Sequence, residues 1–183
     1  MTGLASKRQL RASFFRWALF TVPLVLLLGF LSGQVGSNAQ SAWFQSLVKP
    51  AIFPPPVWFG IVWSILYVLM GVALALVCAA WGARGRTAAI VAFALQFVVN
   101  LAWSPVFFGM HQIRAGLVVI GVLDVLVLVT CLLFWRVRRT AGLLLIPYLA
   151  WIVFATVLNW QFLEANPGGG TDTQSGAVQR YEF

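Results

Sequence analysis

Charged side chains are scarce in this 183-residue chain, and acidic ones are the scarcest. Asp, Glu, Lys and Arg together make up 9% of the residues, with four acidic residues against twelve Lys and Arg. A soluble domain carries roughly 25% charged residues, so a mainly water-exposed exterior is excluded. Hydrophobic residues reach 61%, and the mean hydropathy is +0.92. Lipid is therefore the expected solvent for most of the surface.

Residues that build common catalytic and metal centres are also rare. His111 is the only histidine, and Walker, GxGxxG, HExxH and GxSxG motifs are absent. Cys78 and Cys131 lie inside apolar runs without CxxC or metal-ligand spacing, which indicates packing residues. We expect no metal site and no required cofactor. For His111 two alternatives stay open, a haem ligand from its loop or a loop residue without a special role.

Five apolar runs are long enough to cross a hydrocarbon core of about 30 Å. Backbone amides in lipid must bond within their own segment, so the runs predict helices. The expected fold is an all-α integral membrane protein, a bundle of five transmembrane helices. The expected spans are 14–32, 57–80, 88–108, 115–135 and 141–163. They form one membrane domain over residues 1–165, followed by a flexible tail rich in small and polar residues over 166–183.

The basic residues lie in short segments between the apolar runs, which leaves no basic soluble surface for nucleic acid. Counted on alternate sides of the membrane, nine Lys and Arg lie with the N-terminus and three lie opposite. This asymmetry predicts a cytoplasmic N-terminus if insertion is into an inner membrane. The basic start of the first run also resembles a signal peptide, but no clear cleavage site follows it, so we expect the run to be retained.

The longest connection, residues 33–56, contains aromatic residues and a stiff proline run. Trp43 and Phe44 precede Lys49, and Pro54, Pro55 and Pro56 lead into the second span. Two interpretations stay open. The connection is a rigid lid over the helix ends, or it is an interfacial linker with aromatic anchors.

Three of the predicted helices carry aromatic and polar side chains on one face. The stripes follow steps of three or four residues. They comprise Trp63 and Tyr67 on the second span; Gln96, Asn100, Trp103, Ser104 and Phe107 on the third; and Tyr148, Trp151, Ala155, Asn159 and Phe162 on the fifth. If the stripes face inward, they form a pocket for a flat apolar ligand. The alternative is a solidly packed bundle.

Two further features of the spans have more than one interpretation. They are Asp124, near the middle of the fourth span, and two rows of small residues. The acid is either a hydrogen-bonded packing residue or part of a proton relay or ligand site. The pair Gly29 and Gly33 and the row beginning at Gly71 allow close helix contacts, within one subunit or in a homodimer.

Ordered motifs on several spans closely resemble the translocator protein family. They are WFQSLVKP at 43–50, VWSILY at 62–67, QFVVNLAWSPVFFG at 96–109, and IPY at 146–148 with Trp151, Ala155, Thr156 and Asn159. The family is also known as tryptophan-rich sensory proteins, TspO/MBR proteins or peripheral benzodiazepine receptors. The resemblance spans about residues 17–165, and the tryptophan set is similar to that of bacterial members.

The resemblance implies a commonly dimeric five-helix bundle with a cavity for porphyrins, haem-type tetrapyrroles, sterols, and isoquinoline or benzodiazepine drugs. Trp63 and Trp151 match tryptophans linked to light-dependent porphyrin breakdown in bacterial members; they are the catalytic candidates, although no catalytic set is firm. The expected ligand-binding residues are Phe44, Pro55, Trp63, Tyr67, Asn100, Trp103, Phe107, Tyr148, Trp151, Ala155 and Asn159.

Three functions follow from this resemblance. The preferred one is a membrane receptor or sensor of tetrapyrroles, acting in tetrapyrrole homeostasis or a stress response. The alternatives are light-dependent porphyrin degradation and transport of tetrapyrroles or sterols. Transport is disfavoured by an odd number of spans without an evident internal repeat. The cholesterol-recognition pattern of animal members is incomplete, because no basic residue follows Tyr148 before Arg180.

Overall fold

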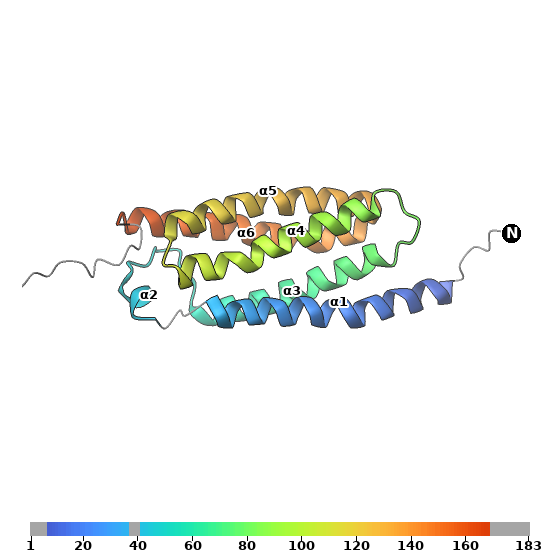
Figure 1. The fold of residues 1–183 in the computed structure, drawn as a ribbon, viewed down its shortest axis with the longest axis horizontal. Coiled ribbons are helices and arrows are strands. Elements are labelled where there is room, and N and C mark those ends of the chain that lie inside the picture. Colours follow the sequence, from blue (N-terminus) through green and yellow to red (C-terminus); the bar gives the residue numbers. More distant parts are fainter. Residues whose placement is uncertain (1–6, 37–40, 169–183) are drawn as a thin grey trace, which may run out of the picture.

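The computed structural model describes residues 7–36 and 41–168, and in these ranges the chain is helical without strands. Five long helices run side by side along the molecule, and a short one lies at one end (Figure 1). The elements are α1 (Lys7–Gly36), α2 (Ala42–Ser46), α3 (Pro56–Cys78), α4 (Arg86–Ser104), the π-helical turn η1 (Pro105–Gly109), α5 (Ile113–Val137) and α6 (Arg139–Ala165). The all-α fold is confirmed.

The five long helices are long and apolar enough to cross a membrane, which makes the chain a multi-pass membrane protein. Large apolar side chains point outward along α1, where Leu19 is 78% exposed. Three predicted spans lie within α1, α5 and α6, the span 88–108 continues from α4 into η1, and the span 57–80 extends two residues past the end of α3. Helix α3 ends at Cys78, because the chain then turns through Gly82 and Gly85, which both have positive φ angles.

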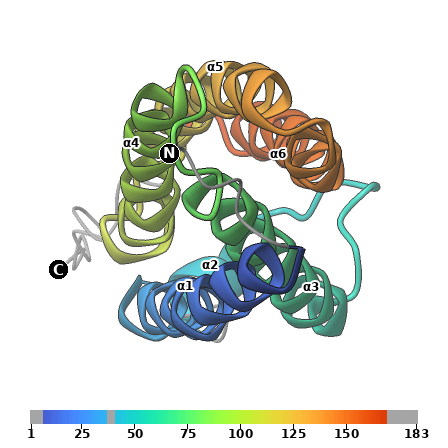
Figure 2. The same cartoon turned by 90° about the vertical axis from the view of Figure 1, so that its right-hand side faces the viewer.

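The long helices pack in the order α1, α3, α6, α5 and α4, and α4 returns to α1 (Figure 2). Close approach of α1 and α3 depends on glycine. A Cβ at Gly71 would overlap the backbone of Val22, and one at Gly29 would overlap the ring of Tyr67. These small-residue contacts therefore lie within one subunit, and the homodimer stays a prediction.

A proline changes the helical geometry at the end of α4. Pro105 has no N–H, so the carbonyl of Leu101 loses its α-helical donor. The Ser32 hydroxyl of α1 donates to that carbonyl at 2.6 Å. The chain continues as η1, in which the Met110 amide donates to the Pro105 carbonyl at 2.8 Å. Such π-helical turns are frequent at functional sites.

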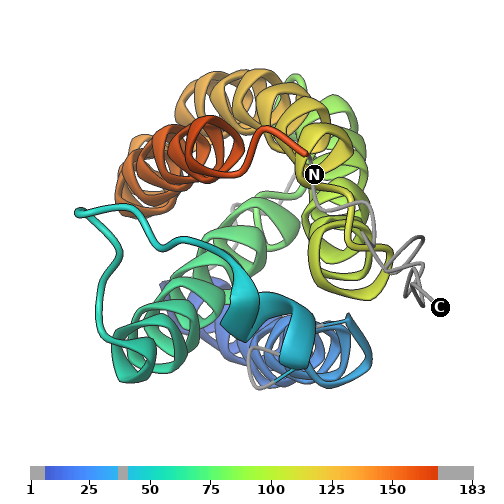
Figure 3. The ribbon, with the colours of Figure 1, turned by 90° about the vertical axis from the view of Figure 1, so that its left-hand side faces the viewer.

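Residues 41–55, which we call the lid, cross the end of the bundle at which α6 ends (Figure 3). The Asn166 side chain accepts from the Val48 amide at 3.0 Å and donates to the Val48 carbonyl at 3.1 Å. The prediction placed Asn166 in the flexible tail, whereas the structure shows it capping α6 and holding the lid. The remaining tail residues, 169–183, lie outside the described residues.

Candidate functional site

A cavity of about 720 Å³ lies under the lid, between the helices. All five long helices contribute to its walls, and most of the lining side chains are aromatic or aliphatic. The rings that line it are Phe30, Phe44, Phe53, Phe59, Trp63, Tyr67, Trp103, Phe107, Phe108, Trp151 and Phe162. The lining is therefore dominated by π faces.

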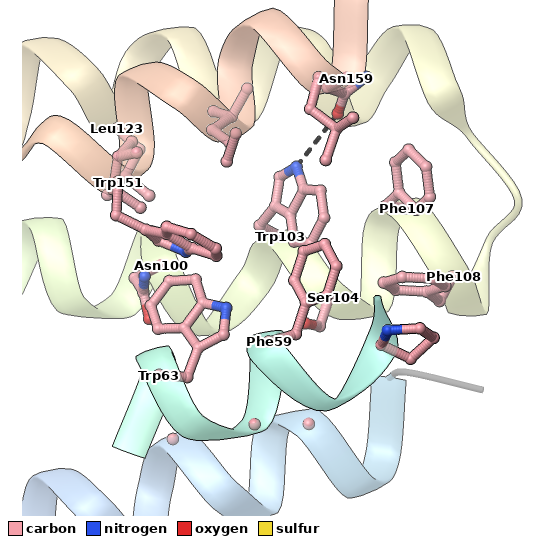
Figure 4. Close-up of a pocket in the computed structure, with 18 of the residues that line it drawn as sticks. Phe59, Trp63, Asn100, Trp103, Ser104, Phe107, Phe108, Leu123, Trp151 and Asn159 are labelled. Atoms are coloured by element: carbon pink, nitrogen blue, oxygen red, sulfur yellow. Dashed lines mark hydrogen bonds between the residues drawn. The ribbon is translucent and has the colours of Figure 1, made fainter. Parts of the chain in front are cut away.

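Three indole rings approach the cavity from three helices (Figure 4). Trp63 of α3 stacks on Tyr67, with ring centroids 5.2 Å apart. Trp103 of α4 stacks on Phe107 of η1 at 5.1 Å. Trp151 of α6 meets Phe59 edge-on at 5.9 Å. These contacts hold each indole in one orientation at the cavity wall.

A buried hydrogen-bond network supports the polar part of this wall. The Asn100 side chain donates to the Tyr148 hydroxyl at 3.0 Å, and that hydroxyl donates to Gln96 Oε1 at 2.9 Å. The Tyr67 hydroxyl donates to Asn100 Oδ1 over a longer distance, 3.4 Å. The network therefore fixes the amide of Asn100 at the cavity surface.

The amide of Asn159 and the indole N–H of Trp151 are two further polar groups in the cavity wall. Asn159 Oδ1 accepts from Trp103 Nε1 at 3.3 Å, and its Nδ2 donates to the Ile113 carbonyl at 3.0 Å. Trp151 Nε1 is buried and has no hydrogen-bond partner in the described part of the chain. That N–H therefore lacks an acceptor within the described residues, and its nitrogen is shielded from the cavity space.

The only charged side chain in the described lining, Lys49, lies on the lid. Its ammonium group donates to the carbonyls of Phe44, Gln45 and Leu47 at 2.5, 2.9 and 3.0 Å. It also lies 4.9 Å from the centre of the Phe44 ring. Lys49 thus ties the end of α2 together while placing a positive charge beside the cavity.

Nine of the eleven predicted ligand-binding residues line the cavity, and two do not. Tyr148 is fully buried behind Asn100, where it supports the wall. Pro55 precedes α3 as its N-cap, and the neighbouring Pro56 lines the cavity instead. The assignment of ligand contacts to the nine lining residues stays a prediction.

Several lining residues were missed by the sequence prediction. Phe59 lies four residues before Trp63, so the stripe on α3 could have been extended to it. Phe108 was not expected beside Phe107, because on a regular helix adjacent side chains diverge by about 100°. Ile120 and Leu123 of α5 carry no signal that distinguishes them from other apolar residues.

Asp124 and His111 lie apart from the cavity lining. Asp124 Oδ2 accepts from the Thr156 hydroxyl at 2.8 Å, which links α5 to α6, and its Oδ1 is buried without a partner among the described residues, so both interpretations of this acid stay open. The His111 ring stacks on Trp43 of the lid, with centroids 4.4 Å apart, and its φ is 55°. His111 thus supports the lid from the loop after η1. The described residues hold no group of three or more potential metal ligands.

Comparison with known proteins shows similarity to one protein family along most of the chain. The profile of the TspO/MBR family matches residues 21–164. The tryptophan-rich protein TspO of Chlorobaculum tepidum is 42% identical over 147 residues, which cover 80% of this chain and 93% of the relative. Protein CrtK of Rhodobacter capsulatus is 39% identical over 131 residues, covering 71% and 82%. The bovine translocator protein is 32% identical over 140 residues, covering 75% and 83%.

Proposed function

Because the chain belongs to the TspO/MBR family of membrane proteins, we propose that it is a receptor or sensor that binds a porphyrin or another tetrapyrrole in the cavity under the lid. The observation that carries the proposal is the convergence of Trp63, Trp103 and Trp151 on one hollow (Figure 4). The bound tetrapyrrole would report tetrapyrrole supply or stress. Sterols and flat isoquinoline or benzodiazepine drugs are further ligands of the same chemistry.

The dimensions and chemistry of the cavity support this proposal. Its volume of about 720 Å³ lies within the range of about 300–1,000 Å³ that is usual for small-molecule sites. Aromatic walls bury a planar conjugated ring by offset or edge contacts. Lys49 places a positive charge near the lid, where acidic side groups of a tetrapyrrole are best accommodated.

Titration with protoporphyrin, followed by tryptophan fluorescence, tests the proposal. Saturable quenching is expected, because the indoles contact the ligand. The double variant Trp63→Phe, Trp151→Phe should reduce the quenched fraction and weaken binding by about tenfold, since well-packed aromatic contacts contribute about 0.5–1.5 kcal/mol each. The control is Trp160→Phe on α6, because Trp160 is 52% exposed and lies outside the cavity lining. Equal effects of the control and double variants would contradict the cavity assignment.

A second candidate is light-dependent oxidation of the bound porphyrin by dioxygen. It is favoured by the position of Trp63 and Trp151, two oxidisable indoles in the cavity wall. This chemistry requires no general base, which fits a cavity without a carboxylate or histidine in its described lining. Illumination with product analysis separates the candidates. Turnover that is lost in the double variant while binding persists would favour catalysis, and bleaching at the rate of free porphyrin would favour binding alone.

We also propose that the N-terminus is cytoplasmic if the chain is inserted into an inner membrane. This proposal is supported by the basic residues at the end of the bundle opposite the lid. They lie in the first turns of α1, α4 and α6, in the last turn of α5, and in the connections at that end, and include Arg8, Arg11, Arg16, Arg84, Arg86, Arg136, Arg138 and Arg139. Protease access to the lid from the outer face of sealed vesicles would test this orientation.

A further inference from the structure

A second hollow, of about 640 Å³, lies at the end of the bundle opposite the lid. It is formed by the first turns of α1, the connection after α3, and the junction of α5 and α6. Figure 2 views the bundle from this end. Arg16 of α1 and Arg138 of the junction both line the hollow, together with the polar residues Gln9 and Ser13. We call this feature the arginine hollow.

The side chains of the two arginines of the hollow lack partners in the described part of the chain. Within the described residues, neither the Arg16 guanidinium nor the Arg138 guanidinium has a hydrogen bond or an ion pair, and the bonds of Arg138 are made by its backbone alone. The two described carboxylates lie elsewhere, Asp124 in the middle of α5 and Glu164 near the lid end of α6. The guanidinium groups therefore share a hollow in which no described acid neutralises them.

Helix ends of opposite polarity meet at the hollow, because Arg138 is the C-cap of α5 as well as a cap of α6. Arg138 is also the N-cap of α6, and no side chain caps that end by a hydrogen bond. The first turns of α1 and α6 contain no acidic residue. Helix N-termini carry a partial positive charge and bind anions through their free amides. The C-terminus of α5 at Val137 carries the opposite partial charge at the same junction, so the guanidinium groups are the feature that favours an anion.

The wall of the hollow is fixed by contacts that do not involve the two free arginines. Arg86 donates to the Cys78 carbonyl at 2.8 Å and lies 4.3 Å from the centre of the Trp81 ring. The Trp17 ring of α1 lies near the Trp81 ring, with the two ring centroids 6.5 Å apart. Trp81 is nevertheless 68% exposed, as expected for an indole at a membrane interface.

We propose that the arginine hollow binds the phosphate group of an anionic phospholipid. Guanidinium groups match phosphate oxygens in a bidentate geometry. The hollow lies where α1 passes from its basic end to a lipid-facing surface that includes Phe15 and Leu19, so acyl chains can follow that surface. The excess of basic residues on one side of the membrane, which orients the protein, requires only exposed residues such as Arg11. It does not explain why two unpaired arginines line one hollow.

Native mass spectrometry of the full chain, in micelles with equal amounts of phosphatidylglycerol and phosphatidylcholine, tests the proposal. Wild type should retain phosphatidylglycerol preferentially. Loss of a direct guanidinium–phosphate contact should weaken binding by at least about fivefold, so Arg16→Gln with Arg138→Gln should weaken retention by about 25-fold. Arg11→Gln is the matched control, because Arg11 is exposed on the same helix and does not line the hollow. It should change retention by less than about twofold.

Three results would overturn the proposal. Equal retention of both lipids by wild type would show that the hollow does not select an anion. An equal loss in the Arg11→Gln control would assign the preference to diffuse charge. Competition by inorganic phosphate at concentrations similar to that of the lipid would assign the hollow to free phosphate. An unchanged thermal unfolding temperature of the Arg16→Gln, Arg138→Gln variant checks that it is folded, and this check depends on neither lipid nor porphyrin binding.

Discussion

The Tyr148 hydroxyl joins two amide side chains at the centre of the bundle. It accepts from Asn100 and donates to Gln96, and all three side chains are buried. Because water and lipid offer no replacement partner at this depth, loss of the hydroxyl leaves an amide hydrogen and an amide oxygen unsatisfied. Tyr148 is therefore a structural support for Asn100 rather than part of the cavity lining.

We expect Tyr148→Phe to lower the free energy of unfolding by about 1–2 kcal/mol, the cost of leaving buried polar groups unpaired. The matched control is Tyr67→Phe, because the Tyr67 hydroxyl makes a single bond of 3.4 Å and should contribute less. Thermal unfolding of the detergent-solubilised protein measures both effects. A larger destabilisation by the Tyr67 variant would contradict this account of the network.

For single residues, the sequence predicted which helix faces carry the aromatic side chains. It did not predict how deep each side chain lies in the bundle. Steps of three and four residues placed Trp151, Ala155 and Asn159 correctly on the cavity side. Tyr148 follows the same step, yet it lies deeper in the bundle, because depth depends on the neighbouring helix and not on the period. The hydrogen bonds from Tyr148 to Asn100 and Gln96 of α4 distinguish this supporting ring from the lining rings.

The pairing of α1 with α3 depends on the absence of a side chain at Gly71. A Cβ there would come within 2.6 Å of the Val22 Cα, a backbone atom that cannot move without shifting α1. By contrast, a Cβ at Gly121 of α5 would meet no atom within 4 Å. The two glycines therefore differ in their role in helix packing, although both lie inside long helices.

Alanine substitutions at the two glycines test this difference. We expect Gly71→Ala to destabilise the fold by about 1–3 kcal/mol through overpacking. Gly121→Ala should be neutral or stabilising by up to about 1 kcal/mol, because alanine has the higher helix propensity. Thermal unfolding in the same detergent compares them. Similar melting temperatures for the two variants would show that α1 moves aside without cost.

Helix existence was predictable because twenty apolar residues in lipid have no alternative to a helix. The π-helical turn η1 was not predictable in the same way. Its formation depends on Pro105 together with a hydroxyl from another helix, Ser32, which satisfies the freed Leu101 carbonyl. The position of Phe108 on the cavity side follows from this tertiary contact and not from the period of the sequence.

At the scale of the whole molecule, the lid links the beginning and the end of the bundle. It follows α1 in the chain, packs Phe44 against Phe108 and Phe162, and is bonded at Val48 to Asn166 after α6. The buried Phe44 ring lies at the cavity, so access to the cavity from this end requires movement of the lid. The paired bonds to Asn166 are exposed, which makes them the contacts most easily opened.

We expect Asn166→Ala to release this part of the lid while the helices stay folded. Loss of the two bonds should favour opening by about 1 kcal/mol, or about fivefold, because exposed hydrogen bonds contribute modestly. Hydrogen exchange at the Val48 amide should accelerate by that factor, and bound porphyrin should dissociate correspondingly faster. Glu164→Gln, on the same helical turn, is the control and should leave both rates unchanged. Faster exchange at Val48 with an unaltered dissociation rate would show that ligands leave between the helices, so the two measurements together identify the route out of the cavity.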